Sequence, residues 1–258
     1  MLKKILVLLL LTPAIASAIE CTRLTASSNP EYPPYLWQTN TQPVQLDGLF
    51  PPFLERLSQA SGLEIEMVYA GPWLRAQTEV HSGNIDIIAV FHTEDRTEWL
   101  DYLQPELIKT DTAVWVNKAN TFEFKQLSDL KNRAGLAVLG HSLGQKSDEY
   151  VDNNLTISKV SSVQQALQML EEQRAEYLVY ARDPGQAYAA QLKTEDIITL
   201  PTPVSTELIF LAFSKKSKCN TSEIKEKLAA ALQQAQQEHW AEELIGPALL
   251  KWQHHAVK

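Results

Sequence analysis

Hydrophobic and polar positions along the chain alternate between two spacings, one typical of helices and one typical of strands. Apolar side chains recur at intervals of three and four over residues 50–57, and Gly62 follows where such a helix would end. Residues 63–69 place apolar and polar side chains alternately, which predicts a strand. A second helix is expected over residues 73–82, followed by a nearly unbroken apolar strand over residues 85–91. Such a strand after a helix is typical of a parallel sheet covered on both faces.

The same order of elements returns in the second half of the chain. Strands are expected at residues 135–139 and 177–180, around a helix that Ser161 or Ser162 caps. Residues 112–116 have the pattern of a strand with no helix before it, which favours an α/β protein with two sheets over one with a single sheet. The remaining predicted elements are a helix that begins at Asp183-Pro184, strands at 197–200 and 208–213, a last long helix at 222–245, and crossovers near 107–112 and 204–208.

The first residues have the pattern of a secretory signal peptide. Lys3 and Lys4 precede an apolar run over residues 5–11, and Ala16-Ser17-Ala18 offers small residues for cleavage. A membrane anchor would need about 20 apolar residues, and Pro13 interrupts a run that is already shorter. We therefore expect residues 1–18 to be removed and the mature protein to be soluble and exported.

Charge and cysteine usage narrow the function classes further. The chain has 23 basic and 31 acidic residues, so its net charge is −8, and removal of residues 1–18 with their two lysines gives 21 − 31 = −10. A nucleic-acid partner is disfavoured, because it would require clustered Lys and Arg. The two cysteines, Cys21 and Cys219, both remain after cleavage, and in an oxidising compartment a pair is expected to form a disulfide. The chain-entropy model gives about 5 kcal/mol as an upper bound for so long a loop.

Short motifs follow one another through the whole mature chain. In order they are Tyr32-Pro33-Pro34-Tyr35, Gly48-Leu49, Pro72-Trp73-Leu74-Arg75-Ala76, Gly83 with Asp86, Thr93-Glu94-Asp95-Arg96, Leu127-Ser128-Asp129-Leu130 and Phe213-Ser214-Lys215-Lys216. Each is short, but the ordered set resembles the periplasmic solute-binding proteins of the polar amino acid type, bacterial family 3. The resemblance implies a type II periplasmic binding protein fold, in which two α/β lobes joined by two crossover strands close on a ligand. Lobe 1 would be residues 19–108 and 206–258, and lobe 2 would be residues 109–205.

The resemblance also implies which residues of lobe 1 bind the ligand. The arginine that ends the T-x-x-R loop binds the ligand carboxylate in this family, and Arg96 matches it. A guanidinium forms two parallel charge-assisted hydrogen bonds to a planar carboxylate, which lysine cannot reproduce. Tyr32 and Trp73 match the positions of aromatic rings around the ligand, and Phe91 would make the pocket more apolar than is usual. The alternative for Arg96 is a surface charge paired with Glu94 or Asp95.

In lobe 2 the resemblance is closest where the ligand carboxylate would be held, and it departs from the family where an ammonium would be held. Gly140, His141 and Ser142 match the loop that offers backbone N–H groups to the ligand carboxylate. The family places an acidic residue after the strand that ends at Tyr180, but Ala181 or Arg182 stands there. Three further candidate ligand contacts are Tyr180, the uncharged Asn29 of lobe 1, and Asp183, whose place before Pro184 suits a helix N-cap. A carboxylate without a neighbouring ammonium is therefore an alternative to an α-amino acid.

One motif favours a different class of function, a serine hydrolase. Residues 138–144 contain G-x-S-x-G after a predicted strand, which would make Ser142 the nucleophile. No His-Gly oxyanion segment precedes this motif, residues 145–148 begin a helix poorly, and the first 110 mature residues leave no place for the hydrolase sheet. The other triad members would be Asp183 or Asp196, and His239 or His254.

The sequence as a whole predicts a binding protein and not an enzyme. The resemblance implies an exported, monomeric protein that delivers a small carboxylate-bearing solute to an inner-membrane ABC permease, without a cofactor. A ligand sensor of the same fold is the other alternative. The six histidines form no H-x-x-H or H-E-x-x-H set, so a metal site is not expected.

Overall fold

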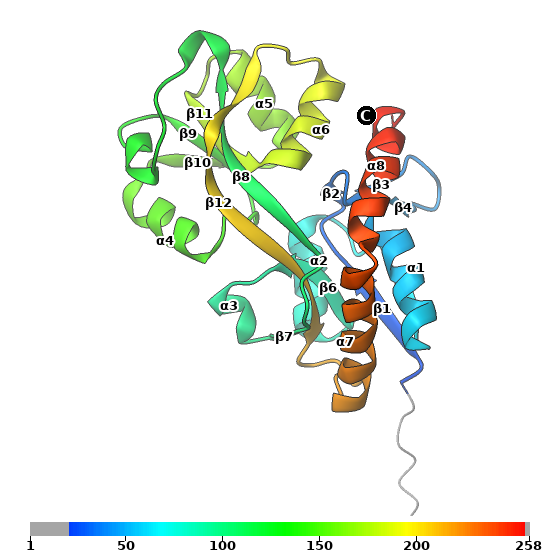
Figure 1. Ribbon diagram of the computed structural model, residues 1–258. Helices are drawn as coiled ribbons and strands as arrows, with labels where there is room; N and C mark the ends of the chain where they lie inside the picture. Colours follow the sequence, from blue (N-terminus) through cyan, green and yellow to red (C-terminus); the bar gives the residue numbers. More distant parts are fainter. Residues whose placement is uncertain (1–20, 256–258) are drawn as a thin grey trace, which may run out of the picture.

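A single long sheet passes through two lobes of the molecule (Figure 1). The computed structural model describes residues 21–255, so the predicted signal peptide at 1–18 lies outside the described residues. The nine-stranded sheet has the order β10-β9-β11-β8-β12-β6-β1-β5, with β7 also paired to β12. The prediction of two separate sheets is therefore wrong, because β8 (Ile108–Asn117) and β12 (Ile197–Ser214) connect the two halves.

β12 is one continuous strand at the position where the sequence predicted two strands and a crossover. The strand stays paired antiparallel to β8 from Ile197 to Ile209, and its register shifts between Thr199 and Pro203 and again between Pro203 and Ser205. Proline has no backbone N–H to donate to a ladder, so an irregularity at this point is expected. The paired strands β8 and β12 run diagonally from one lobe to the other in Figure 1.

The first lobe contains the parallel strands β1 (Arg23–Ser27), β5 (Glu64–Met67) and β6 (Ile87–Phe91). The predicted helices at its start are confirmed as α1 (Phe50–Ser61) and α2 (Trp73–Ser82). The apolar face of α1 is buried, and the helix ends at Gly62, whose φ of 70° suits glycine. This lobe also contains α3 (Glu94–Thr97), β7 (Leu100–Tyr102) and a small sheet of β2 (Glu31–Tyr32), β3 (Leu36–Gln38) and β4 (Leu46–Asp47).

The second lobe contains β9 (Gly135–Val138), β10 (Ile157–Val160) and β11 (Tyr177–Ala181). Ser162 caps the helix α5 (Val163–Glu171), because its side chain accepts a hydrogen bond from the Gln165 amide. The other elements of the lobe are α4 (Gln145–Asn154), α6 (Arg182–Leu192) and the short 3-10 helices Lys118–Asn120 and Leu127–Leu130. The lobe boundaries expected near residues 108 and 206 fall inside β8 and β12.

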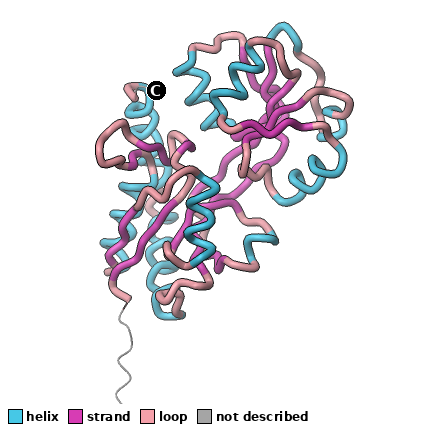
Figure 2. Tube along the Cα trace, turned by 180° about the vertical axis from the view of Figure 1, so that it is seen from behind, coloured by secondary structure: helices cyan, strands magenta, loops and turns pink. Residues whose placement is uncertain are grey.

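The prediction of one long helix at residues 222–245 is wrong. The structure has two helices there, α7 (Ser222–Gln237) and α8 (Trp240–Gln253). His239, between them, has a φ of 55°, a left-handed conformation that a continuing helix does not adopt. α8 lies beside α1, and its far end approaches the second lobe in both views (Figures 1 and 2). There the Trp252 indole donates to the Ala187 carbonyl of α6 at 2.9 Å. Within residues 21–255 no helix is long and apolar enough to cross a membrane.

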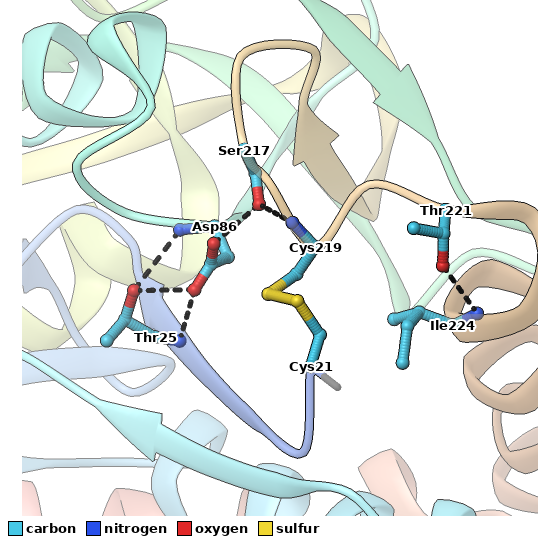
Figure 3. The surroundings of a disulfide bond; sticks show 7 residues. All are labelled: Cys21, Thr25, Asp86, Ser217, Cys219, Thr221 and Ile224. Atoms are coloured by element: carbon cyan, nitrogen blue, oxygen red, sulfur yellow. Dashed lines mark hydrogen bonds between the residues drawn. A yellow bond between two sulfur atoms is a disulfide. The ribbon is translucent and has the colours of Figure 1, made fainter. Parts of the chain in front are cut away.

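The predicted disulfide is confirmed: Cys21 is bonded to Cys219, and it ties the residues before β1 to the loop before α7 (Figure 3). The Asp86 carboxylate lies next to the bond. It accepts hydrogen bonds from the Thr25 amide at 2.8 Å, the Thr25 hydroxyl at 3.0 Å and the Ser217 hydroxyl at 2.5 Å. The Ser217 hydroxyl in turn accepts from the Cys219 amide at 3.0 Å. Three separate segments of the first lobe are joined at this point.

Candidate functional site

A cavity lies between the two lobes and is lined by residues of both. It contains seven of the residues that the sequence singled out, while Tyr180 lines a neighbouring cavity and Gly140 lies beside the wall. The seven predicted residues at this cavity are Asn29, Tyr32, Trp73, Phe91, Arg96, His141 and Ser142. Residues that lie far apart in the chain therefore meet at one place.

The strand β6 and the short helix α3 place Arg96 in the wall of this cavity. Thr93 caps α3, because its hydroxyl accepts from the Arg96 amide at 3.4 Å. The guanidinium donates to the Phe91 carbonyl at 3.2 Å and to the Gln77 side chain at 3.1 Å, and both of these acceptors are neutral. Only 8% of the residue is exposed, so it is not the surface charge that the sequence left as the alternative.

Arg96 is a buried charge without a directly bonded counter-ion among residues 21–255. Burial lowers its pKa below the ordinary value, and the charges of Asp148 and Asp95 act in the opposite direction from farther away. The guanidinium carbon lies 5.9 Å from the centre of the Trp73 ring. A buried cation of this kind is stabilised when an anion enters its cavity.

Aromatic rings form most of the remaining wall. The Tyr32 and Phe91 rings meet edge to face at 6.5 Å, and both residues are buried. The Trp73 indole donates across the lobes to the Gly140 carbonyl at 2.8 Å. Gly140 has a φ of 73°, and a Cβ there would lie 2.5 Å from Leu74, so a larger residue would disturb this contact. Predominantly apolar walls with a few polar groups are typical of small-molecule sites.

His141 extends from the second lobe into this group of rings. Its ring lies 4.7 Å from that of Tyr180, 5.7 Å from that of Tyr32 and 6.1 Å from that of Phe91. Burial, and then the charge of Arg96, lowers the pKa of His141 to about 3, so the imidazole is neutral at physiological pH. Its Nε2 atom is buried without a hydrogen-bond partner. The site thus contains a neutral imidazole nitrogen that a ligand could satisfy.

Ser142 is not arranged as a nucleophile. Its hydroxyl donates to Asp148 at 2.5 Å and accepts from the Gly144 amide at 3.2 Å. The residues after it do form a helix, α4, so the expectation that residues 145–148 begin a helix poorly was wrong. Three of the other proposed triad members have their nearest partners elsewhere: Asp183 accepts from Tyr35, while Asp196 and His239 lie 3.9 Å from the charged groups of Lys118 and Glu242.

Asp183 lines neither the cavity at Arg96 nor the cavity beside it. It is also not the N-cap of α6, because Ala181 occupies that position and Asp183 stands in the first turn. Its carboxylate accepts from the Tyr35 hydroxyl at 2.5 Å, which is a contact between the lobes. Asn29 does line the cavity, and its side-chain oxygen accepts from the Glu31 amide at 3.0 Å.

Sequence reasoning missed one acidic residue, Glu31. A second cavity shares Asn29, Trp73 and His141 with the first cavity, and Glu31 and Tyr180 also line it. Burial raises the pKa of the Glu31 carboxyl above its ordinary value. Successive residues of a strand point to opposite faces, so Tyr32, which the sequence analysis selected, and its neighbour Glu31 point in opposite directions. This alternation was the signal in the sequence that could have pointed to Glu31.

Comparison with known proteins identifies the fold. No family model matches the chain, and no curated protein sequence matches it either. Among solved structures, an amino acid ABC transporter substrate-binding protein from Streptococcus pneumoniae bound to L-arginine superposes with a TM-score of 0.71 at 17% identity, covering 90% of this chain and 96% of that one. An ancestral arginine-binding protein bound to arginine gives 0.68 at 22% identity, covering 90% and 98%. A histidine kinase sensor domain with similarity to periplasmic binding proteins gives 0.71 at 17% identity, covering 87% and 96%.

The chain therefore has the fold of the amino acid-binding type of periplasmic binding protein, as the sequence predicted. Similarity at 17% to 22% identity concerns the fold alone. These neighbours include both transport proteins and a sensor domain, so the fold does not decide between the two roles.

Proposed function

We propose that this protein captures a small carboxylate-bearing solute between its two lobes, with Arg96 binding the carboxylate. The observation that carries the proposal is a buried guanidinium in the wall of the cavity between the lobes, bonded only to neutral acceptors among residues 21–255. A planar guanidinium matches a carboxylate through two parallel hydrogen bonds. A carboxylate bound there would supply the missing negative charge.

In the proposed capture, the two lobes close on the ligand from opposite sides. One lobe consists of residues 19–108 and 206–258, and the other of residues 109–205. Contacts across the cleft support it, since the Trp73 indole and the Glu94 amide of the first lobe donate to Gly140 and Gln145 of the second. β8 and β12 would serve as the hinge because they are the strands that both lobes share. Ligand release would break the cleft contacts and expose the aromatic wall.

Export to the periplasm and delivery to an inner-membrane ABC permease complete the proposal. The disulfide and the fold shared with ABC transporter substrate-binding proteins support this role. Ligand sensing is the second candidate, supported by the histidine kinase sensor domain among the structural neighbours. Both roles need the same capture step, so the carboxylate site can be tested without choosing between them.

The test begins with a thermal-shift screen of amino acids, keto acids, dicarboxylates and aromatic acids. A ligand present at 100 times its Kd stabilises the folded protein by about 2.7 kcal/mol, which such a screen detects. Calorimetry on Arg96→Ala should then show a loss of about 2–5 kcal/mol, because truncation leaves the bound carboxylate desolvated and unpaired. Affinity should fall by roughly 30-fold to several thousandfold.

Two further variants make the result specific. Arg96→Lys should also lose much of the affinity, because an ammonium keeps the charge but not the planar pair of donors. Arg75→Ala is the matched control, since Arg75 lies on α2 close to the site in sequence but its side chain is 69% exposed. Binding by Arg96→Ala within threefold of the wild type would refute the proposal.

A further inference from the structure

We propose that Glu31 and His141 form a second recognition point, for a cationic group at the far end of the ligand. The preferred ligands would then carry a carboxylate at one end and an amine or guanidinium group at the other. This inference rests on the proposed function, because it takes Arg96 as the carboxylate site. It adds a residue from β2 that no family motif pointed to.

The two cavities adjoin, so a ligand bound at one can extend toward the other. The cavity at Arg96 and the cavity at Glu31 meet at Asn29, Trp73 and His141. Arg96 lines only the first and Glu31 only the second. A ligand that filled both would therefore bring its two ends to opposite charges, separated by a middle part that the aromatic walls contact.

Glu31 is a carboxylate that the protein itself leaves unpaired. The backbone amide of Glu31 is bonded to Asn29, but its carboxylate takes part in no hydrogen bond or ion pair described within residues 21–255. The residue is half-buried, and burial is the cause that raises the pKa of its carboxyl. A partly desolvated acid without a partner is costly, and a cation brought by a ligand would offset that cost.

His141 supplies a second acceptor at the junction of the cavities. Its Nε2 atom is buried and has no partner among the described residues, and a neutral imidazole offers one nitrogen lone pair. An ammonium or guanidinium group has several N–H donors and can bond to a carboxylate and an imidazole together. The rings of Tyr180 and Trp73 also line this second cavity and can attract a cation to their faces.

The position of Glu31 also decides where on the ligand the cation lies. Among residues 21–255, no acidic residue lines the cavity that contains Arg96. An α-ammonium group, only two bonds from the carboxylate carbon, would lie in that cavity, beside a guanidinium and without an acid. A cation several bonds away from the carboxylate instead reaches the cavity that contains Glu31.

Four compounds with the same six-carbon chain separate these possibilities. Hexanoate has neither amine, norleucine has the α-amine, 6-aminohexanoate has the terminal amine, and lysine has both. Calorimetry on the wild-type protein should rank 6-aminohexanoate and lysine above hexanoate and norleucine by about 10- to 100-fold, the range expected for hydrogen bonds to a charged partner. In Glu31→Gln that preference should disappear, while the affinity for hexanoate stays the same.

Glu64→Gln is the matched control, because Glu64 is an exposed acid of the same lobe whose side chain is 65% exposed. Wild-type protein that binds hexanoate as tightly as 6-aminohexanoate would overturn the second recognition point, as would a terminal-amine preference that survives Glu31→Gln. Arg96→Ala should weaken all four compounds alike, and if it weakens none of them the proposed function itself is overturned. If none of the four binds while the thermal-shift screen finds another carboxylate ligand, the second recognition point is overturned and the proposed function stands.

Discussion

Two polar clusters of the first lobe differ in how completely their hydrogen bonds are satisfied. Around the disulfide, Asp86 accepts three hydrogen bonds from Thr25 and Ser217, and the chain segments there are joined covalently as well (Figure 3). At the cleft, Arg96 bonds only to neutral acceptors, and the carboxylate of Glu31 has no described partner within residues 21–255.

The difference distinguishes polar groups that stabilise the fold from polar groups that do not. A buried or half-buried polar group that is fully paired stabilises the structure it lies in, whereas an unpaired one costs free energy that folding alone does not recover. The cluster at Asp86 is of the first kind. The groups at the cleft are of the second kind. Arg96 and Glu31 carry opposite charges in adjoining cavities, and a zwitterionic ligand would supply the missing partner of each. Stability and ligand affinity should therefore respond to changes in different places.

The largest expected effect is on stability, from removal of the disulfide. Replacing both cysteines, as Cys21→Ser with Cys219→Ser, frees a loop spanned by 198 residues. The free energy of unfolding should fall by up to about 5 kcal/mol, because the unfolded chain gains the entropy that the cross-link removed. Urea denaturation of the wild-type and double-variant proteins measures the change.

Ligand affinity is the control for this comparison. The disulfide lies away from both cavities, so calorimetry at a temperature where the double variant is folded should give the wild-type Kd within threefold. A loss of affinity comparable to that of Arg96→Ala would show that the two clusters are coupled, contrary to the distinction drawn between them.

Local patterns in the sequence were sufficient for the helices and strands over residues 50–91 of the first lobe. The helix α2 was predicted with the same bounds as in the structure, because its apolar spacing and the following Gly83 are both local signals. β12 was predicted as two strands because Pro201 and Pro203 have the pattern of a break. Pairing with β8 keeps the strand continuous through a register shift, and no local pattern could show that pairing.

The site residues that belong to a local motif could be predicted from the sequence. Those whose role depends on contacts between the two lobes could not. The T-x-x-R loop brought attention to Arg96, and the structure puts it in the wall of the cavity. Asp183 was interpreted through its neighbour Pro184, but its bonding partner Tyr35 is 148 positions away in the chain. Glu31 was missed because its exposure to the second cavity depends on Tyr180 and His141, which come from the other lobe.

A smaller effect is expected from pH, through His141. In the structure, burial and the charge of Arg96 lower its pKa to about 3, whereas an imidazole exposed by opening of the lobes would return to its ordinary pKa of 6.5. The closed form then binds fewer protons than the open form. The free energy that favours the closed form over the open form is therefore at its full value above pH 6.5. It decreases as the pH falls below 6.5, by up to about 1.4 kcal/mol per pH unit.

Calorimetry with hexanoate between pH 7.5 and pH 5.5 tests this expectation, and affinity should fall by about tenfold. Hexanoate is chosen because it has no cationic end, so protonation of Glu31 in the second cavity contributes little. The groups around His141 are the charge of Arg96 and the rings of Tyr32, Tyr180 and Phe91. In His141→Gln the affinity should be nearly independent of pH over this range, and a slope equal to that of the wild type would contradict the role of His141.

The smallest effect is expected at Ser142, whose G-x-S-x-G motif pointed to a hydrolase. Its hydroxyl donates to Asp148, which also accepts from the Leu143 amide at 2.8 Å, so the serine holds the loop before α4 in place. Ser142→Ala should lower the free energy of unfolding by about 1 kcal/mol, the usual value for one such hydrogen bond. Ser158→Ala, an exposed serine of the same lobe, should change it by less than about 0.5 kcal/mol.

The same residue decides between a binding protein and an enzyme. A serine nucleophile needs a base that accepts its proton, and the hydroxyl of Ser142 bonds to a carboxylate and a backbone amide instead of to a histidine. Incubation with a fluorophosphonate probe, followed by mass spectrometry, should leave Ser142 unlabelled in the wild-type protein. Stoichiometric labelling that disappears in Ser142→Ala would show that the cleft can activate this hydroxyl. In that case the unpaired groups at Arg96 and His141 would have to be reinterpreted as parts of a catalytic site.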